Sequence, residues 1–180
     1  MKYLVSLFIL LPVICSCHFK KETELLDSFL GSKVILYTDS MLNIKDGRNR
    51  IDDVDYTYVV YIDSTDCSEC AIKSVTWWAN DSDLLNALET GKLGLAFIFS
   101  PRNNVQKQII KIIKEESVFP QYTYVDTSKL VVKYNPNIPQ NRLLHTFMID
   151  NNGKVIMAGS PITNEKVKKI FLKIINKGYP

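Results

Sequence analysis

Two cysteines three positions apart, Cys67 and Cys70, are the residues of this chain best suited to chemistry. They follow an apolar run, Tyr56–Ile62, and open a segment with helical periodicity. A structural zinc site needs two further Cys or His ligands. The remaining Cys and His residues of the chain are far from this pair in the sequence and form no second ligand motif. At the start of a helix, unpaired backbone N–H groups and the helix dipole favour a thiolate on the first cysteine. The spacing therefore indicates a pair that can form and break a disulfide.

The first seventeen residues indicate export and lipid attachment. Lys2 supplies a positive start, and Tyr3–Val13 is an apolar run shorter than the roughly 20 residues of a membrane span. The run ends in Ile14-Cys15-Ser16-Cys17, which resembles the bacterial lipobox. The resemblance implies cleavage before Cys17 and acylation of that cysteine; a plain signal peptide is the alternative. We expect a lipid-anchored protein of the bacterial cell envelope, on the periplasmic side, where disulfides persist.

The spacing of apolar residues predicts the strands and helices that position the cysteine pair. The predicted helices cover residues 22–30, 67–78, 83–89, 105–114, 127–134 and 164–176. The predicted strands cover residues 34–37, 56–62, 93–99, 122–125, 146–149 and 155–158, with an ordered loop over 38–55 that holds at most one short strand. Asn152-Gly153 predicts a hairpin between the last two strands. This order predicts an α/β domain with a central mixed sheet, a C-terminal hairpin and a closing helix.

The length, composition and net charge of the chain limit the number of domains and the kinds of partner that we expect. A chain of 180 residues with 46% hydrophobic residues predicts one globular domain. The net charge of +3 is small and scattered, which argues against nucleic acid as a partner. We expect a signal peptide over 1–16, a lipid anchor with tether and short helix over 17–32, and a folded domain over 33–180. The sequence contains no Gly-rich phosphate loop, and we expect no cofactor and no metal.

From residue 33 to residue 176 the sequence resembles the thioredoxin superfamily, especially the extracytoplasmic TlpA/AhpC-TSA-type redoxins and a group of uncharacterised bacterial lipoproteins. The resemblance rests on the C-x-x-C pair after a strand, on the strand Leu95–Phe99 followed by a helix, and on the closing helix. Its most specific part is the block Thr146-Phe147-Met148-Ile149-Asp150 leading into Gly153-Lys154-Val155-Ile156. The resemblance implies a thioredoxin-like fold in which Cys67 attacks a disulfide and Cys70 resolves the intermediate.

Two features depart from the redoxin pattern. Where the family has a cis-proline before the hairpin strand, this chain has His145. A cis bond before a residue other than proline costs about 3 kcal/mol, so we expect a trans bond. We also expect the His145 ring within reach of the pair, where an imidazolium would support the Cys67 thiolate. Asp66 and Glu69, predicted to cap the helix, flank Cys67 with carboxylates that oppose a thiolate.

These features predict a membrane-anchored thiol–disulfide oxidoreductase, acting as a reductase or isomerase. The predicted catalytic residues are Cys67, Cys70 and His145, and the predicted partners are protein thiols or disulfides. The main alternative is a non-catalytic protein-binding lipoprotein in which Cys67 and Cys70 form a structural disulfide. A metal or iron–sulfur site that includes His145 and a peroxidase are weaker alternatives.

Overall fold

A computed structural model describes residues 23–44, 54–64, 68–116 and 122–179. Its strands are β1 (Leu42–Asn43), β2 (Tyr56–Ile62), β3 (Leu93–Phe99), β4 (Tyr122–Val125), β5 (Thr146–Asp150) and β6 (Val155–Ala158). Its helices are residues 23–29, α2 (Ser68–Asn80), α3 (Ser82–Glu89), α4 (Gln106–Glu115), α5 (Leu130–Tyr134) and α6 (Glu165–Lys177), with the 3-10 helices η1 (Thr38–Ser40) and η3 (Arg142–Leu144).

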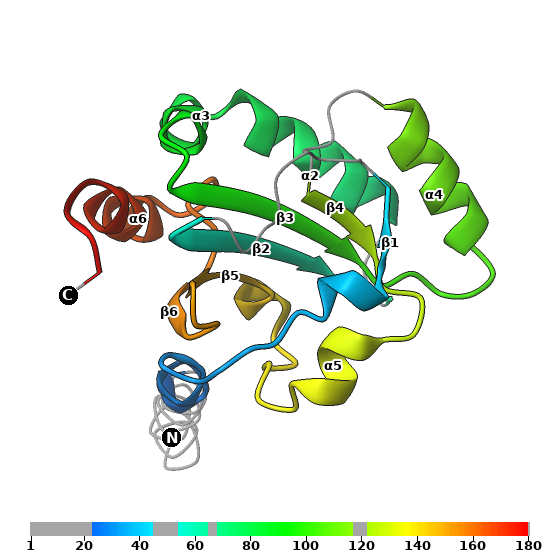
Figure 1. The fold of residues 1–180 in the computed structure, drawn as a ribbon, viewed down its shortest axis with the longest axis horizontal. Coiled ribbons are helices and arrows are strands. Elements are labelled where there is room, and N and C mark those ends of the chain that lie inside the picture. The colour runs from blue at the N-terminus through cyan, green and yellow to red at the C-terminus, as the bar shows by residue number, and fades with distance from the viewer. Residues whose placement is uncertain (1–22, 45–53, 65–67, 117–121, 180) are drawn as a thin grey trace, which may run out of the picture.

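The strands form one mixed six-stranded sheet in the order β1-β4-β3-β2-β5-β6. β2, β3 and β4 run parallel to one another, β5 pairs antiparallel with both β2 and β6, and β1 pairs antiparallel with β4. The carboxyl ends of β2, β3 and β4 therefore lie at one edge of the sheet, where the chain turns into α2, α4 and α5 (Figure 1). The predicted α/β order with a mixed sheet, a hairpin and a closing helix is confirmed.

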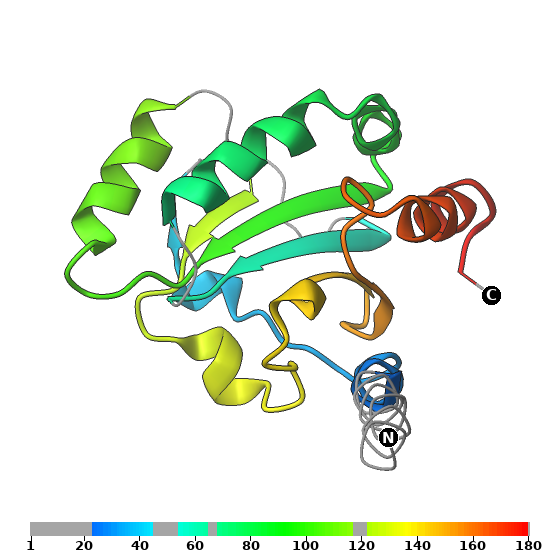
Figure 2. The ribbon, with the colours of Figure 1, turned by 180° about the vertical axis from the view of Figure 1, so that it is seen from behind.

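Helices cover both faces of the sheet. α2, α3 and α4 lie on one face, and α5 and the helix over 23–29 lie on the other (Figures 1 and 2). Side chains of β2 alternate between the two cores: Tyr58 and Val60 contribute to the core that includes α2, whereas Val59 and Tyr61 contribute to the opposite core. Because a strand buried on both faces needs apolar residues at every position, β2 shows no alternation of polar and apolar residues.

The strand predicted over Val34–Tyr37 is wrong, because this segment pairs with no strand beyond its first residues. Lys33 forms an isolated antiparallel bridge with Lys154, and Val34 N–H donates to the Gly153 carbonyl at 2.8 Å. The β5–β6 hairpin then ends, while the segment continues across the sheet face to η1 (Figure 1). β-Branched composition favours an extended backbone but cannot supply the neighbouring strand.

The Asn152-Gly153 hairpin is confirmed, and its geometry requires the glycine. Gly153 has a φ of +79°, a value that L-residues rarely adopt. A Cβ atom added there would lie 2.6 Å from the Val34 carbonyl oxygen. The Asp150 carboxylate accepts N–H bonds from Asn152 and Lys154, both at 2.9 Å. The turn therefore fixes both the hairpin and the path of the segment that begins at Val34.

The helix predicted over 127–134 begins three residues later than expected, at Leu130. The buried Asp126 carboxylate accepts the N–H groups of Leu130 at 2.8 Å and Val131 at 2.9 Å. Lys129, directly before the helix, adopts a left-handed φ of +55°. Asp126 therefore sets the start of α5 by satisfying the N–H groups of its first turn.

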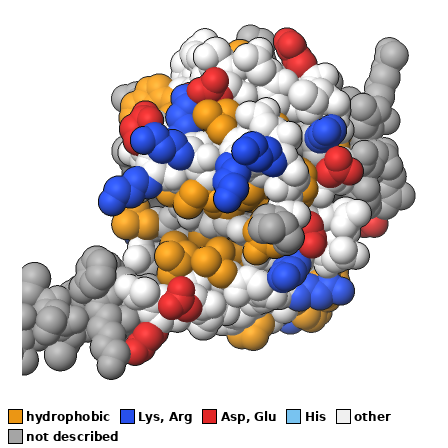
Figure 3. Space-filling view, turned by 90° about the vertical axis from the view of Figure 1, so that its left-hand side faces the viewer, with side chains coloured by type: hydrophobic (Ala, Val, Ile, Leu, Met, Phe, Trp, Pro, Cys, Tyr) orange, Lys and Arg blue, Asp and Glu red, His pale blue; other side chains and the backbone are white. Residues whose placement is uncertain are grey.

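The closing helix α6 carries a basic outer face. It buries Phe171, Ile174 and Ile175 against the core shared with α2. Figure 3 shows the side of the molecule formed by α6, where Lys and Arg side chains gather across the surface. The exposed lysines of this helix are Lys166, Lys169, Lys173 and Lys177.

Candidate functional site

The predicted cysteine pair falls at the junction between β2 and α2. β2 ends at Ile62, and α2 begins at Ser68, so Cys70 belongs to the first turn of the helix. Cys67 and Asp66 lie outside the described residues, as does the predicted lipidation residue Cys17. The strand before the pair and the helix that contains Cys70 are thus both found, whereas the position of Cys67 stays a prediction. The N–H groups of a first helical turn have no partner within the helix, which makes this junction suitable for a thiolate.

Hydrogen bonds hold together the loops at this edge of the sheet. Ser100 N–H donates to the Ile62 carbonyl at 2.8 Å, directly after β3 and at the end of β2. Arg102 Nε donates to the Ser64 carbonyl at 3.0 Å. Asp126 N–H donates to the Phe99 carbonyl at 2.8 Å. The loops that follow β2, β3 and β4 therefore support one another at the end of the sheet where the pair begins.

His145 lies directly before β5, beside the end of β2. Its carbonyl accepts the Tyr61 N–H at 2.9 Å, and Thr146 is in register with Val60. The structure contains no cis peptide bond among the described residues, which confirms the expected trans bond before His145. The backbone of His145 is therefore fixed by the sheet next to the strand that leads to the cysteine pair.

The His145 ring is buried on the sheet face opposite α2. Its centroid lies 5.4 Å from that of Tyr61, whose side chain belongs to the core on the α5 side. Nε2 lies 2.9 Å from the Pro139 carbonyl oxygen. Because a carbonyl oxygen only accepts, Nε2 carries a hydrogen, and the buried Nδ1 has no hydrogen-bond partner in the described part of the chain. These contacts give His145 a role in holding the loop that begins at Pro139; its expected contact with Cys67 stays a prediction.

The sequence analysis did not identify two buried polar residues, Asp126 and Asn135, whose hydrogen bonds fix segments on the α5 side of the sheet. Asp126 caps α5, as described above. Asn135 ends α5 and bonds both backbone groups of Ile35, accepting its N–H at 2.8 Å and donating to its carbonyl at 2.9 Å. An Asp four residues before a helix is a local signal that could have been found. The Asn135–Ile35 contact joins residues 100 positions apart and has no local signal.

The described residues contain no group of three or more His, Cys, Asp or Glu side chains arranged to hold a metal ion. Within the same ranges, no helix has the length and apolar character needed to cross a membrane.

Comparison with known proteins gives matches in structure alone. No protein-family model matches the sequence, and no curated protein matches it. A thioredoxin-like protein from Bacteroides caccae matches with a TM-score of 0.54 and 14% identity over 89% of this chain and 55% of that chain. This chain therefore spans about half the length of that relative.

Two further solved structures are matched over nearly their whole length. The C-terminal domain of an uncharacterized protein from Bacteroides fragilis has a TM-score of 0.52 and 18% identity over 78% of this chain and 95% of that one. A domain of a possible thiol-disulfide isomerase from Cytophaga hutchinsonii has a TM-score of 0.51 and 18% identity over 82% of this chain and 95% of that one. Together with the mixed sheet flanked by helices, these matches show that the chain has a thioredoxin-like fold.

Proposed function

We propose that this protein is a thiol–disulfide oxidoreductase, a reductase or isomerase of protein disulfides, held in the bacterial cell envelope by a lipid anchor at Cys17. The observation that carries the proposal is the position of the C-x-x-C pair. In the sequence Cys67 follows β2, a central strand of a thioredoxin-like sheet, and Cys70 falls in the first turn of α2. The possible thiol-disulfide isomerase from Cytophaga hutchinsonii shares this fold and is consistent with the proposal.

In the proposed reaction the Cys67 thiolate attacks one sulfur of a substrate disulfide. The substrate S–S bond breaks, its other sulfur leaves as a thiolate, and a mixed disulfide forms with Cys67. The deprotonated Cys70 then attacks the Cys67 sulfur and releases the second substrate thiolate. Two electrons pass to the substrate, and the protein is left with a Cys67–Cys70 disulfide that a dithiol donor protein must reduce. In isomerisation a substrate thiolate displaces Cys67 instead, and no net electrons are transferred.

Trapping of the mixed disulfide tests this proposal. We expect the Cys70→Ser variant to accumulate a covalent complex with a disulfide-containing protein such as insulin, because no second thiol resolves it. The matched Cys67→Ser variant lacks the attacking thiol and should form no complex. The wild-type chain should reduce insulin in the presence of dithiothreitol faster than dithiothreitol alone.

The alternative is a binding module with a structural disulfide. It predicts that neither variant forms a complex and that the wild-type chain leaves the rate of insulin reduction unchanged. That outcome would overturn the enzymatic proposal. A Cys67–Cys70 bridge that excess glutathione leaves intact would support the binding module.

A further inference from the structure

The segment after Val34 runs alongside an open space where a neighbouring strand would lie. Residues 32–34 pair with the hairpin: Val155 N–H donates to the Ser32 carbonyl at 2.9 Å, and Val34 N–H donates to Gly153 at 2.8 Å. The hairpin turn then ends the pairing. Leu36 is the next residue whose backbone faces the same side, because the backbone groups of an extended chain alternate in direction.

The backbone N–H and carbonyl groups of residues 34–36 differ in their hydrogen bonding between the two sides of the segment. On the outer side, the Asn135 amide bonds both the N–H and the carbonyl of Ile35. On the inner side, the Val34 carbonyl lies against Gly153 of the turn, whereas both backbone groups of Leu36 have no hydrogen-bond partner among the described residues. Val34 is 2% exposed and Leu36 is 8% exposed. Backbone groups in such a position require water or a ligand as partner.

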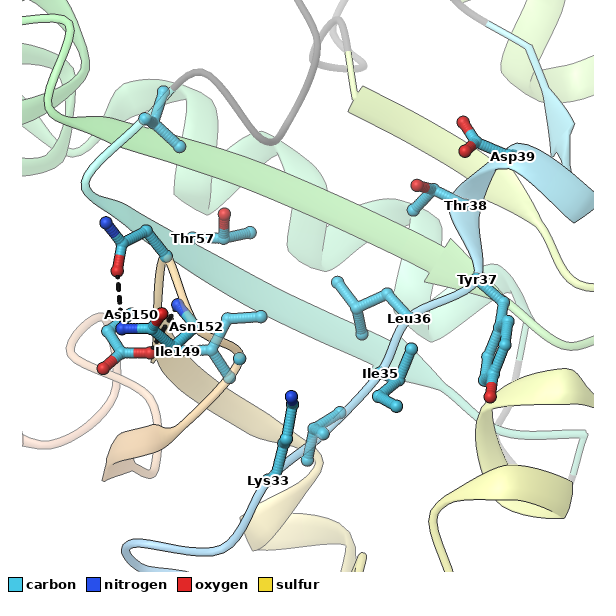
Figure 4. Close-up of a pocket in the computed structure, with 14 residues that line it drawn as sticks. Lys33, Ile35, Leu36, Tyr37, Thr38, Asp39, Thr57, Ile149, Asp150 and Asn152 are labelled. Atoms are coloured by element: carbon cyan, nitrogen blue, oxygen red, sulfur yellow. Dashed lines mark hydrogen bonds between the residues drawn. The ribbon is translucent and has the colours of Figure 1, made fainter.

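A pocket of about 410 Å³ lies beside these backbone groups. Figure 4 shows the segment from Lys33 to Asp39 along one side, Asp150 and Asn152 of the hairpin turn on the other, and Thr57 of β2 between them. Its volume falls within the range of about 300–1,000 Å³ typical of ligand sites. Apolar side chains of Leu36 and Ile149 and polar groups of the turn line it together.

We propose that this pocket binds a short extended peptide of another protein, which adds as a strand beside Val34–Tyr37. A peptide backbone offers a donor and an acceptor at strand spacing, which matches the Leu36 N–H and carbonyl. Addition of a strand to an exposed backbone edge is a recurring mode of peptide recognition, in which main-chain hydrogen bonds supply affinity. A small molecule without alternating donors and acceptors would leave part of this set unpaired.

The peptide site goes beyond the proposed redox function and is separate from it in space. Leu36 and Ile149 line the pocket and belong to the core on the α5 side of the sheet. Cys70 belongs to α2, which lies on the opposite face of the sheet (Figure 1). Binding at one site can therefore be measured without chemistry at the other.

A library of random heptapeptides that contain no cysteine, displayed on phage and selected against the full chain, provides the probe. Omission of cysteine prevents capture through disulfide exchange. We expect enriched peptides whose binding slows hydrogen exchange of the Leu36 amide at least 10-fold at saturation. Methylation of alternate backbone nitrogens of the best peptide should weaken binding at least 10-fold, and methylation of the intervening nitrogens should not.

A matched pair of variants localises the binding. Asn151 is exposed on the turn and lines the pocket, so Asn151→Trp should obstruct the pocket and weaken peptide binding at least 10-fold. Lys111→Trp adds the same side chain to the exposed surface of α4, away from the pocket, and should leave peptide affinity unchanged. Both variants should retain the insulin reduction rate of the wild-type chain. The proposal is overturned if no peptide is enriched, or if the enriched peptides protect other amides and bind Asn151→Trp normally.

Discussion

At the scale of single residues, His145 shows how a buried polar side chain can hold a loop. Its Nε2–H group bonds the Pro139 carbonyl, six residues earlier, and its ring packs against Tyr61. Only 5% of His145 is exposed, so water cannot readily replace that hydrogen bond if the imidazole is removed. The histidine thus fixes the loop from Pro139 into β5 with a side chain rather than with a restricted peptide bond.

We predict that His145→Ala destabilises the fold by about 1–3 kcal/mol, because it leaves the Pro139 carbonyl without a donor and opens a cavity. Urea unfolding measures the loss. His145→Gln can place an amide nitrogen near the position of Nε2 and should recover part of the stability. Thiol titration of the same variants tests the other role expected for this residue. A shift in the pH dependence of Cys67 alkylation would place the imidazole in the reactive site, whereas an unchanged profile would leave it as a loop anchor.

At the scale of secondary-structure elements, the β5–β6 turn depends on the approach of the 34–37 segment. Gly153 and Gly91 have similar positive φ values, +79° and +71°. A Cβ at Gly153 would lie 2.6 Å from the Val34 carbonyl oxygen, whereas a Cβ at Gly91 would have no atom within 4 Å. The two glycines therefore share the same conformational requirement and differ in their surroundings.

We predict that Gly91→Ala costs about 1–2 kcal/mol of stability, the typical penalty for a left-handed L-residue. Gly153→Ala should cost more, because the backbone of Val34 must also move. Denaturant unfolding of the two variants gives the difference directly. Equal losses of unfolding free energy in the two variants would mean that the 34–37 segment can move away from the added methyl group at little cost. That result would contradict the conclusion that the turn fixes the path of the segment.

A second element-scale contact joins α3 to α6. Lys168 Nζ lies 2.9 Å from an Asp81 carboxylate oxygen and 2.8 Å from Asp83. Burial alone would raise the pKa of Asp81, but hydrogen bonds from Leu84 N–H and Lys168 outweigh burial and lower that pKa. Hydrogen bonds to Asp83 and Asp81 raise the pKa of Lys168. The lowered pKa of Asp81 adds stability above the unfolded-state value near 4, and this stability is lost as pH falls through the folded-state value.

We predict that Lys168→Met lowers the melting temperature at about pH 7 and reduces the loss of stability between about pH 5 and pH 3. The raised pKa of Lys168 also means that its own contribution is lost only as pH rises above the ordinary range of lysine. Lys169→Met, on the exposed side of the same helix, is the control and should leave the pH profile unchanged. Identical profiles of stability against pH for the two variants would show that solvent screens the α3–α6 ion pairs so strongly that they do not stabilise the fold.

At the scale of the whole molecule, the lipid anchor determines where the proposed chemistry takes place. We predict that Cys17→Ala abolishes acylation and moves the protein from the membrane fraction to the soluble fraction. Two or more acyl chains bind a bilayer stably, whereas one chain gives only marginal binding. Intact-mass analysis of the purified native protein checks for the acyl groups. A mass without them would leave a plain signal peptide as the explanation of the N-terminal run.

The sequence by itself determined the order of the elements and the location of the cysteine pair. The strands 56–62, 93–99, 122–125 and 155–158 are found with the bounds predicted for them, because their apolar composition reports burial on both faces of a sheet. The Asn152-Gly153 turn and the trans bond before His145 also follow from local rules of backbone geometry. These features depend on neighbours in the sequence, which a sequence shows directly.

Only the tertiary structure decided which groups meet across the chain. Val34–Tyr37 forms no strand because the hairpin ends beside Val34. The hydrogen bonds of Ile35 depend on Asn135, 100 positions away. The direction of the His145 ring followed from the register of β5 on β2, which assigns it to the Tyr61 face of the sheet. Pairing and register are set by packing between distant segments, and no local pattern of residues encodes that packing.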